Sequence, residues 1–219
     1  MSKTITVKGV GKVSASPDLV ALSMVLESQD LIYEKAMDDA ARNIEQLNTA
    51  LETVGFEKKS VKTTNFNVRT DYGYKRSRNG DNERVFNGYV VKHNLKLEFD
   101  FDSKRLAKTL SVVGSCLAHP QLTISFTVKD PTAIKEEMLR LAVENAKTKA
   151  EILCDAAGKQ LGELLSIDYN WGDLSIYSDT RYDMEESCFA APMAKCAEID
   201  IEPDDIDVSD TVTFVWEIK

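Results

Sequence analysis

The chain has 219 residues, of which 43% are hydrophobic, so it can bury a full core and disorder throughout is excluded. Its formal net charge is −9, so the negative backbone of a nucleic acid would on average repel its surface, which disfavours nucleic-acid binding. No apolar stretch is long enough to span a bilayer, and the N-terminus lacks the apolar core of a signal peptide. We therefore expect an acidic, cytoplasmic protein without a transmembrane segment.

The first part of the chain predicts two adjacent strands and a helix. Apolar residues alternate through residues 3–13 and again through residues 20–26, with a turn between the two runs. After Asp30, apolar residues recur every three or four positions as far as Val54, and Gly55 provides a stop signal. This pattern predicts a helix that lays one apolar stripe against the sheet.

Two glycines interrupt the first predicted strand. The run Gly9-x-Gly11-Lys12 invites comparison with a phosphate-binding loop, but Ser14 replaces the third glycine of the dinucleotide fingerprint and a strand follows. Glycines inside a strand usually mark a bulge or a close backbone approach. We therefore expect Gly9 and Gly11 to be structural.

A long hairpin is predicted next. Phe66, Val68, Thr70 and Tyr72 share one face of a third strand. A fourth strand is predicted with one face formed by Val85, Tyr89, Val91, Leu95, Leu97, Phe99 and Phe101. The connection carries a basic cluster, which could bind an acidic partner segment or be a solvated tip: Lys75, Arg76, Arg78 and Arg84.

The longest predicted helix spans about 131–157. Asp130 can cap its start, Pro131 suits the first helical position, and Gly158 can end it in a left-handed conformation. Its apolar stripe is mostly alanine, which permits close packing on a sheet. The other elements predicted in the second half are a short helix ending at Gly114 and strands at residues 122–128, 165–171 and 206–218.

The segment from about 172 to 205 shows no sustained periodicity and is far longer than ordinary connections. It is acidic, yet it contains large apolar residues that a solvated linker seldom keeps, among them Tyr177, Tyr182 and Phe189. We expect this insertion to pack partly against another copy of the chain, with its acids close to Arg76 and Arg78.

The predicted order is β-β-α-β-β-α-β-α-β-β in a single domain, residues 1–219. Neighbouring strand pairs favour antiparallel pairing, and each helix has one apolar stripe. The sequence therefore predicts an α+β fold with a mixed, largely antiparallel sheet and helices packed on one face.

No motif for a metal, a cofactor or catalysis stands out, so we expect none of the three. His93 and His119 have no metal-spaced partners, and no nucleophile elbow G-x-S-x-G occurs. The cysteines form no C-x-x-C pair, so reduced thiols are the default, although Cys188 and Cys196 share one segment and could pair or bind metal.

Short pieces distributed over residues 3–171 and the last strand also recur in one known family. They are Val7-x-Gly9-x-Gly11-x-Val13 leading to Pro17-Asp18, Gly55, Thr63-Thr64-x-Phe66-x-Val68 with Tyr72, Gly88-Tyr89, Ala142, Ala146, Lys149-Ala150, Gly158 and Leu161-Gly162. In order and spacing they resemble the SIMPL domain family, also called domain of unknown function 541. The resemblance implies an α+β fold, no established reaction, and a tendency of at least one bacterial relative to form large ring-like or channel-like homo-oligomers. Relatives are described as periplasmic or outer-membrane-associated immunogenic proteins, as oxidative-stress defence proteins, and as an adaptor that associates with a kinase.

Two hypotheses for function follow. The first is a non-enzymatic interaction or assembly protein that acts as a homo-oligomer, with another protein as a further candidate partner. The second is a hydrolase or small-ligand enzyme with a carboxylate-lined cleft. The candidate partner contacts are Lys75, Arg76, Arg78, Arg84, Tyr177, Tyr182 and Phe189. Residues expected to be structural are Gly9, Gly11, Pro17, Gly88, Tyr89, Gly158 and Gly162.

Overall fold

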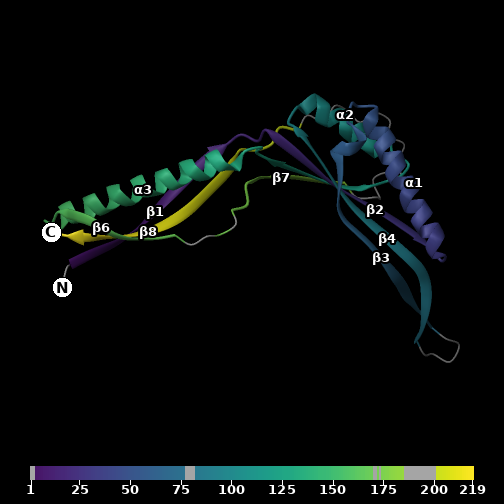
Figure 1. The fold of residues 1–219 in the computed structure, drawn as a ribbon, viewed down its shortest axis with the longest axis horizontal. Coiled ribbons are helices and arrows are strands. Elements are labelled where there is room, and N and C mark those ends of the chain that lie inside the picture. The colour runs from purple at the N-terminus through teal and green to yellow at the C-terminus, as the bar shows by residue number, and fades with distance from the viewer. Residues whose placement is uncertain (1–2, 77–81, 170–171, 173, 185–200) are drawn as a thin grey trace. The chain divides into compact units, whose positions relative to one another are not determined.

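The computed structural model describes residues 3–76, 82–169, 172, 174–184 and 201–219 (Figure 1). The strands are β1 Lys3–Ala15, β2 Leu19–Asp30, β3 Val61–Arg76, β4 Asn82–Asp100, β5 Gln121–Thr127, β6 Leu161–Asp168, β7 Tyr177–Met184 and β8 Ile206–Ile218. The helices are α1 Tyr33–Glu52, α2 Ser103–Gly114 and α3 Pro131–Ala156, with a 3-10 turn at Lys58–Ser60. The predicted α+β class is confirmed.

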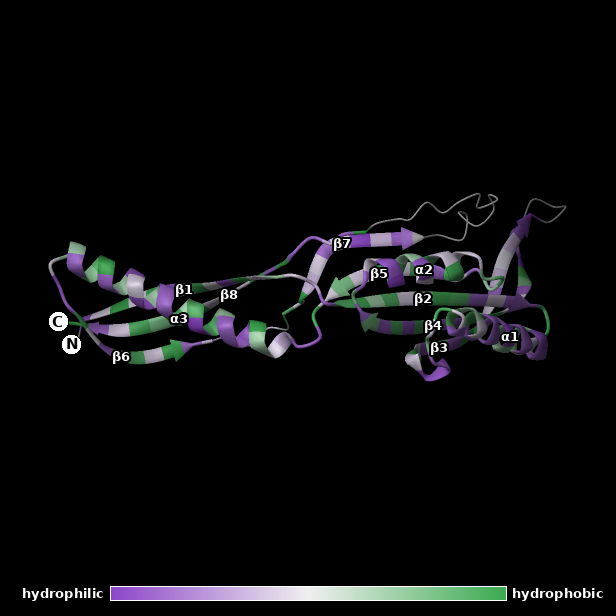
Figure 2. Ribbon diagram, turned by 90° about the horizontal axis from the view of Figure 1, so that it is seen from above, coloured by the Kyte–Doolittle hydropathy of each residue, from purple (hydrophilic) through white to green (hydrophobic). Residues whose placement is uncertain are grey.

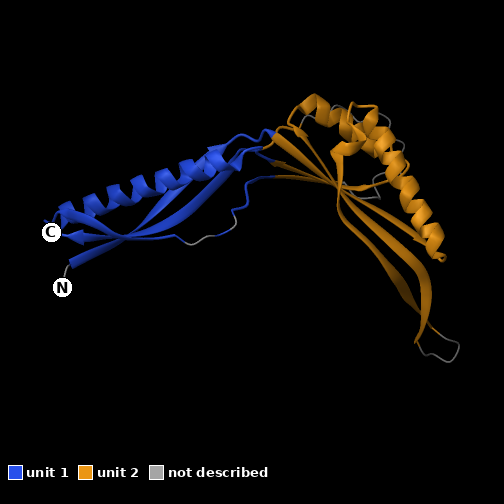
Figure 3. Cartoon of the chain, viewed as in Figure 1, with its two compact units in different colours: residues 1–18, 127–179, 204–219 blue, residues 19–126, 180–203 orange. Residues whose placement is uncertain are grey.

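The chain forms two compact units, each with its own sheet, where the sequence led us to expect one sheet (Figure 3). Unit 1 contains residues 1–18, 127–179 and 204–219, and unit 2 contains residues 19–126 and 180–203. The prediction that residues 1–219 behave as a single domain stays a prediction. Each unit is described separately below.

Unit 1 is a three-stranded antiparallel sheet, in the order β1-β8-β6, with α3 packed on one face. The helix buries a stripe in which alanine predominates: Met138, Ala142, Ala146, Ala150 and Cys154. Phe214 and Trp216 of β8 stack on each other below this stripe, with ring centroids 5.3 Å apart. The alanines hold α3 close to the strands, because short side chains allow close packing.

The glycines of β1 make this close packing possible. A Cβ atom on Gly9 would overlap the carbonyl oxygen of Ala142, and one on Gly11 would overlap the carbonyl oxygen of Met138. The predicted close backbone approach is therefore confirmed. Pro17 is buried in the turn that follows β1.

Both predicted ends of the long helix are confirmed. The Asp130 carboxylate accepts a hydrogen bond from the backbone N–H of Thr132 at 2.9 Å, and this bond lowers the pKa of Asp130. Pro131 is the first helical residue, and Gly158 has a φ of +64° just after the helix.

Unit 2 is a five-stranded sheet in the order β3-β4-β2-β5-β7, with α1 and α2 contributing to the same core. β2, which is largely hydrophobic in Figure 2, lies at the centre of the sheet. The fully buried side chains of this core include Leu22, Met24, Leu26, Leu47, Leu97, Leu106, Ile124 and Phe126.

The segment 172–205 contains a strand that the sequence did not predict. β7 forms one edge of the five-stranded sheet, and Tyr182 and Ile201 pack against the core of unit 2. Ile176 is buried in unit 1 with Leu174 packed beside it. Several apolar side chains of the segment are thus buried within their own chain. The predicted packing of this segment against another copy stays a prediction.

Candidate functional site

The outer part of the β3–β4 hairpin contains the basic cluster predicted from the sequence. β3 and β4 pair as far as Arg76 and Asn82, which confirms the predicted long hairpin. Lys75 and Arg76 are exposed at the end of β3, and Arg84 is exposed on β4. Arg78 lies outside the described residues. Three of the four predicted basic residues therefore lie on neighbouring strands.

A β-bulge changes which side chains of β4 share a face. Asp71 pairs with Gly88 and Tyr72 pairs with Phe86, so Asn87 is the extra residue. An extra residue reverses the inward and outward alternation beyond it. Phe86 therefore lies on the same face of β4 as Tyr89. The sequence had predicted Val85 on that face, and this prediction was wrong for the residues beyond the bulge.

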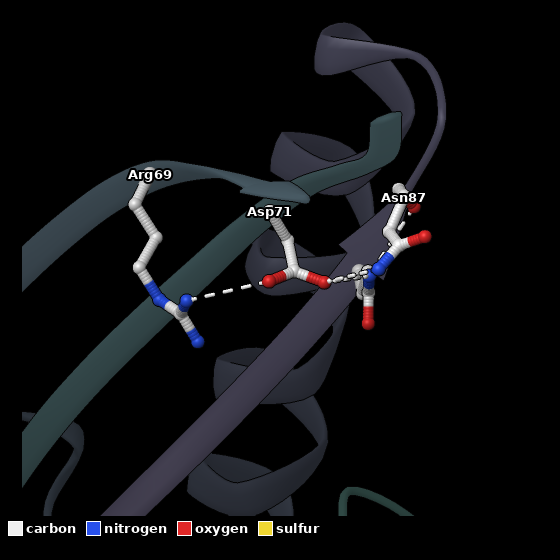
Figure 4. A network of polar contacts seen from close by, with 4 residues as sticks. Arg69, Asp71 and Asn87 are labelled. Atoms are coloured by element: carbon white, nitrogen blue, oxygen red, sulfur yellow. Dashed lines mark hydrogen bonds and ion pairs between the residues drawn. The ribbon is translucent and has the colours of Figure 1, made fainter. Parts of the chain in front are cut away.

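A polar network on the opposite face of the sheet holds the bulge in place. The Asn87 side-chain amide donates to the Asp71 carboxylate at 3.0 Å, and Arg69 lies 3.7 Å from the same carboxylate (Figure 4). The Gln29 amide donates to the backbone carbonyl of Asn87 at 3.2 Å. The bulged carbonyl thus has a partner that the strand ladder does not supply.

On the α1 face, four aromatic rings form a continuous row. The aromatic row consists of Tyr33, Tyr89, Phe86 and Tyr72. Consecutive ring centroids are 5.5, 5.3 and 5.5 Å apart, all in edge-to-face geometry. The guanidinium of Arg84 lies 3.8 Å from the ring centroid of Tyr72 and ends the row with a positive charge.

Three of the four rings remain substantially exposed: Tyr33 at 48%, Tyr72 at 41% and Phe86 at 37%. Leu31 and Ile32, directly before Tyr33, are 64% and 48% exposed. Single exposed apolar side chains are common, but a contiguous group of this kind indicates an interaction surface.

Tyr33 and Phe86 were not predicted from the sequence to be parts of this surface. The start of α1 brings Tyr33 to β4 through tertiary packing, and the bulge turns Phe86 to its face. Tyr72 and Tyr89 were predicted to lie on faces of their strands but not as partner contacts, and the structure places both in the row.

The remaining candidate contacts do not join the aromatic row. β7 lies at the opposite edge of the five-stranded sheet from β3. Tyr177 of β7 is 47% exposed, whereas Tyr182 packs against the core of unit 2. Phe189 lies outside the described residues, as do Cys188 and Cys196.

His93 lies farther along β4 than the aromatic row and is partly buried. Its Nε2 lies 2.8 Å from the Thr63 hydroxyl, and its ring meets Phe66 edge-to-face at 5.1 Å. Burial lowers the pKa of His93 below its ordinary value of 6.5. The His93 imidazole therefore binds a proton more readily in the unfolded chain than in the folded one. Its contribution to the free energy of unfolding is fully present above pH 6.5 and is lost as the pH falls through the folded-state pKa.

We accordingly expect the wild-type protein to lose more free energy of unfolding than His93→Gln between about pH 7.5 and 5.5. The measurement is urea unfolding at both pH values. Equal losses in the two proteins would contradict this account of His93.

Within the described residues, no group of three or more His, Cys, Asp or Glu side chains is arranged to hold a metal ion. Cys116 and Cys154 are free and buried. None of the described helices is both long and apolar enough to cross a membrane.

Comparison with known proteins identifies relatives of this fold. The 26 kDa periplasmic immunogenic protein of Brucella melitensis is 27% identical over 163 residues, which cover 74% of this chain and 65% of that protein. The chain thus spans just under two thirds of the length of that relative. The uncharacterized protein YggE of Escherichia coli K12 is 23% identical over 218 residues, covering 98% of this chain and 83% of YggE.

A third relative is the interleukin-1 receptor-associated kinase 1-binding protein 1 of Mus musculus, 24% identical over 169 residues, or 76% of this chain and 60% of that protein. The profile of the family SIMPL, described as "Protein of unknown function (DUF541)", matches residues 5–216. Because this match covers nearly the whole chain, the chain belongs to the SIMPL family.

Proposed function

We propose that the chain is a non-enzymatic interaction and assembly protein that forms a homo-oligomer through the outer β3–β4 hairpin. The observation that carries this proposal is the exposed aromatic row. Tyrosine, phenylalanine and arginine are enriched at protein interfaces, because they bury much area at a low cost in conformational entropy. The row presents three tyrosines and one phenylalanine, with Arg84 stacked on the last ring.

Charge supports a second copy as the partner. The hairpin end carries Lys75, Arg76 and Arg84, whereas the chain as a whole has a net charge of −9. A basic patch on an acidic protein is complementary to the acidic surface of another copy. The described acids of the segment 172–205 are exposed, among them Asp179, Asp183 and Glu202, and they would supply such a surface. Charge would set the orientation, and burial of the rings would supply most of the affinity.

The relatives add two points. The mouse relative is named for binding a kinase, which supports protein binding as the shared activity. The Brucella relatives are named periplasmic, which weighs against the cytoplasmic location expected from the sequence.

The test is solution mass by light scattering at micromolar concentration. We expect the wild-type protein to have a mass that is a multiple of 24.4 kDa, and the double variant Tyr72→Ser, Phe86→Ser to shift towards 24.4 kDa. Both substitutions are on exposed side chains of the aromatic row. The matched control is Leu117→Ser, because Leu117 is 77% exposed and lies outside the hairpin.

Salt gives a second readout. Raising the salt concentration should weaken the assembly without abolishing it, since salt screens surface charge and leaves apolar burial intact. A wild-type protein that is monomeric at every salt concentration would refute the proposal, as would an oligomer that the double variant leaves intact.

A further inference from the structure

The two edges of the three-stranded sheet in unit 1 differ in whether side chains hydrogen-bond to their outer backbone groups. At the β1 edge, the backbone N–H of Val10 donates to the Asn145 side chain at 3.0 Å. The Lys149 ammonium donates to the backbone carbonyl of Lys8 at 3.2 Å. Side chains of α3 thus occupy hydrogen-bonding groups that another strand would need. An edge protected in this way does not accept a further strand.

At the β6 edge, no side chain of the described residues hydrogen-bonds to the outer backbone groups, and β8 is the one strand paired with β6 there. The pairing with β8 is interrupted by two register shifts, between Leu161 and Leu164 and between Leu164 and Ser166. Just before β6, Gln160 and Lys219 exchange both backbone hydrogen bonds, at 3.0 and 2.9 Å. Because the direction of these groups alternates along a strand, the N–H and C=O of Leu161 point to the outer edge. Outward-facing backbone groups that could start the pairing of an added strand are therefore present at Leu161, and the register shifts beyond it change which residues of β6 face outward.

β6 also exposes apolar side chains, with Leu164 at 47%, Leu165 at 52% and Ile167 at 56% exposure. Leu164 pairs with Trp216 and Ile167 with Phe214, and directly paired side chains share a face. Leu164 and Ile167 therefore lie on the face of the sheet that α3 covers elsewhere. α3 packs mainly over β1 and β8, and Figure 2 shows β6 extending beyond it.

One flank of α3 completes this surface. At about 100° per residue, Val143 lies about 60° to one side of the buried Ala146, and Lys149 lies about 60° to the other side. Lys149 reaches the β1 edge, so Val143 is on the flank towards β6, and it is 46% exposed. The β6 shelf, formed by Leu164, Ile167 and Val143, would receive alternate side chains of a strand added beside β6.

We infer that the β6 edge binds an extended peptide segment of a partner protein by strand addition, with aliphatic side chains in alternation and basic residues at its ends. Main-chain hydrogen bonds would supply affinity, and the β6 shelf would select aliphatic residues at alternate positions. The preference for basic ends follows from charge, because Glu163 and Asp168 are the charged residues of β6 and both are acidic.

A second copy fits this edge less well. In symmetric antiparallel pairing centred between Leu165 and Ser166, Glu163 of one copy would face Asp168 of the other, and like charges directly opposite each other are destabilising. The eight-residue strand is short for an interface of about 800 Å² per partner, whereas it suits a peptide.

The probe is a fluorescein-labelled peptide in which valine alternates with threonine between terminal lysines, titrated with the full chain and followed by anisotropy. We expect saturable binding that weakens with salt, at least about tenfold weaker binding to Ile167→Lys, and a similar loss when alternate peptide nitrogens are methylated. The same peptide with terminal glutamates should bind more weakly. The matched control is Ile152→Lys, since Ile152 is 61% exposed on α3 and lies about 120° from Ala146, away from β6.

The methylated peptide tests the inference even if Ile167→Lys fails to fold, because it leaves the protein unchanged. Absence of binding, equal binding of the methylated peptide, or an equal loss with Ile152→Lys would overturn strand addition at β6. Loss of self-association in Ile167→Lys, without any binding of the peptide, would assign the edge to a second copy and also overturn it. The double variant Tyr72→Ser, Phe86→Ser should retain peptide binding, which separates this inference from the proposed assembly through the hairpin.

Discussion

Replacing Gly9 by alanine is expected to lower the free energy of unfolding of unit 1 by about 3 kcal/mol or more, at the upper end of the range for overpacked cores. The new Cβ atom would overlap the carbonyl oxygen of Ala142 and would also lie 2.7 Å from the Cβ atom of Ala146. A side chain can change rotamer to escape an overlap, but a backbone carbonyl within a helix cannot move alone. Gly11→Ala should have a similar effect through Met138.

The measurement is urea unfolding followed by circular dichroism and tryptophan fluorescence, with Gly172→Ala as the matched control. A Cβ atom on Gly172 would meet no atom within 4 Å, so this variant should be near neutral. The double variant Gly9→Ala, Ala146→Gly separates the two overlaps, because it relieves the side-chain contact and leaves the carbonyl in place. It should remain strongly destabilised. If Gly9→Ala were as stable as Gly172→Ala, the close approach of α3 to β1 would be wrong.

The features of unit 1 that the sequence predicted are those determined by local chemistry. Asp130, Pro131 and Gly158 mark the ends of α3, because each acts on backbone groups within one turn of the helix. Gly9 and Gly11 indicated close packing because a glycine in a strand otherwise weakens it. The sequence did not show what approaches them, since residues 138 and 142 are distant in the chain.

The candidate site was predicted only in part, for the same reason. The basic residues of the hairpin could be located because a turn signal lies between two alternating runs. The aromatic row could not, because Phe86 joins it only through the bulge and Tyr33 only through the packing of α1. β7 was missed because its pairing with the edge of the sheet depends on strands far away in the chain.

The second large effect is expected at Gly88, which makes the bulge possible. Gly88 has a φ of +125°, a conformation that residues with a Cβ atom rarely adopt. A Cβ atom there would also lie 2.5 Å from the carbonyl oxygen of Asp30, where the chain leaves β2 towards α1. Backbone strain of about 1–3 kcal/mol and the overlap act together, so Gly88→Ala should lower the free energy of unfolding of unit 2 by about 2–4 kcal/mol.

Gly73→Ala is the matched control on the neighbouring strand. A Cβ atom on Gly73 would lie 2.9 Å from the side-chain nitrogen of Asn87, and this side chain can shift at the cost of its hydrogen bond to Asp71, whereas a backbone carbonyl cannot. Its effect on urea unfolding should therefore be clearly smaller than that of Gly88→Ala. Equal effects would contradict the assignment of the strain to Gly88.

The Gly88→Ala variant also tests whether the geometry of the bulge is needed for assembly. The chain from Asp30 to Tyr33 passes directly beside Gly88, so displacing it should separate Tyr33 from Tyr89 and weaken the near-ultraviolet circular dichroism of the tyrosines. At temperatures where the variant is still folded, its solution mass should fall in parallel with that signal, as in the double variant of Tyr72 and Phe86. A folded Gly88→Ala protein with a disrupted tyrosine signal and unchanged mass would show that assembly does not use the aromatic row.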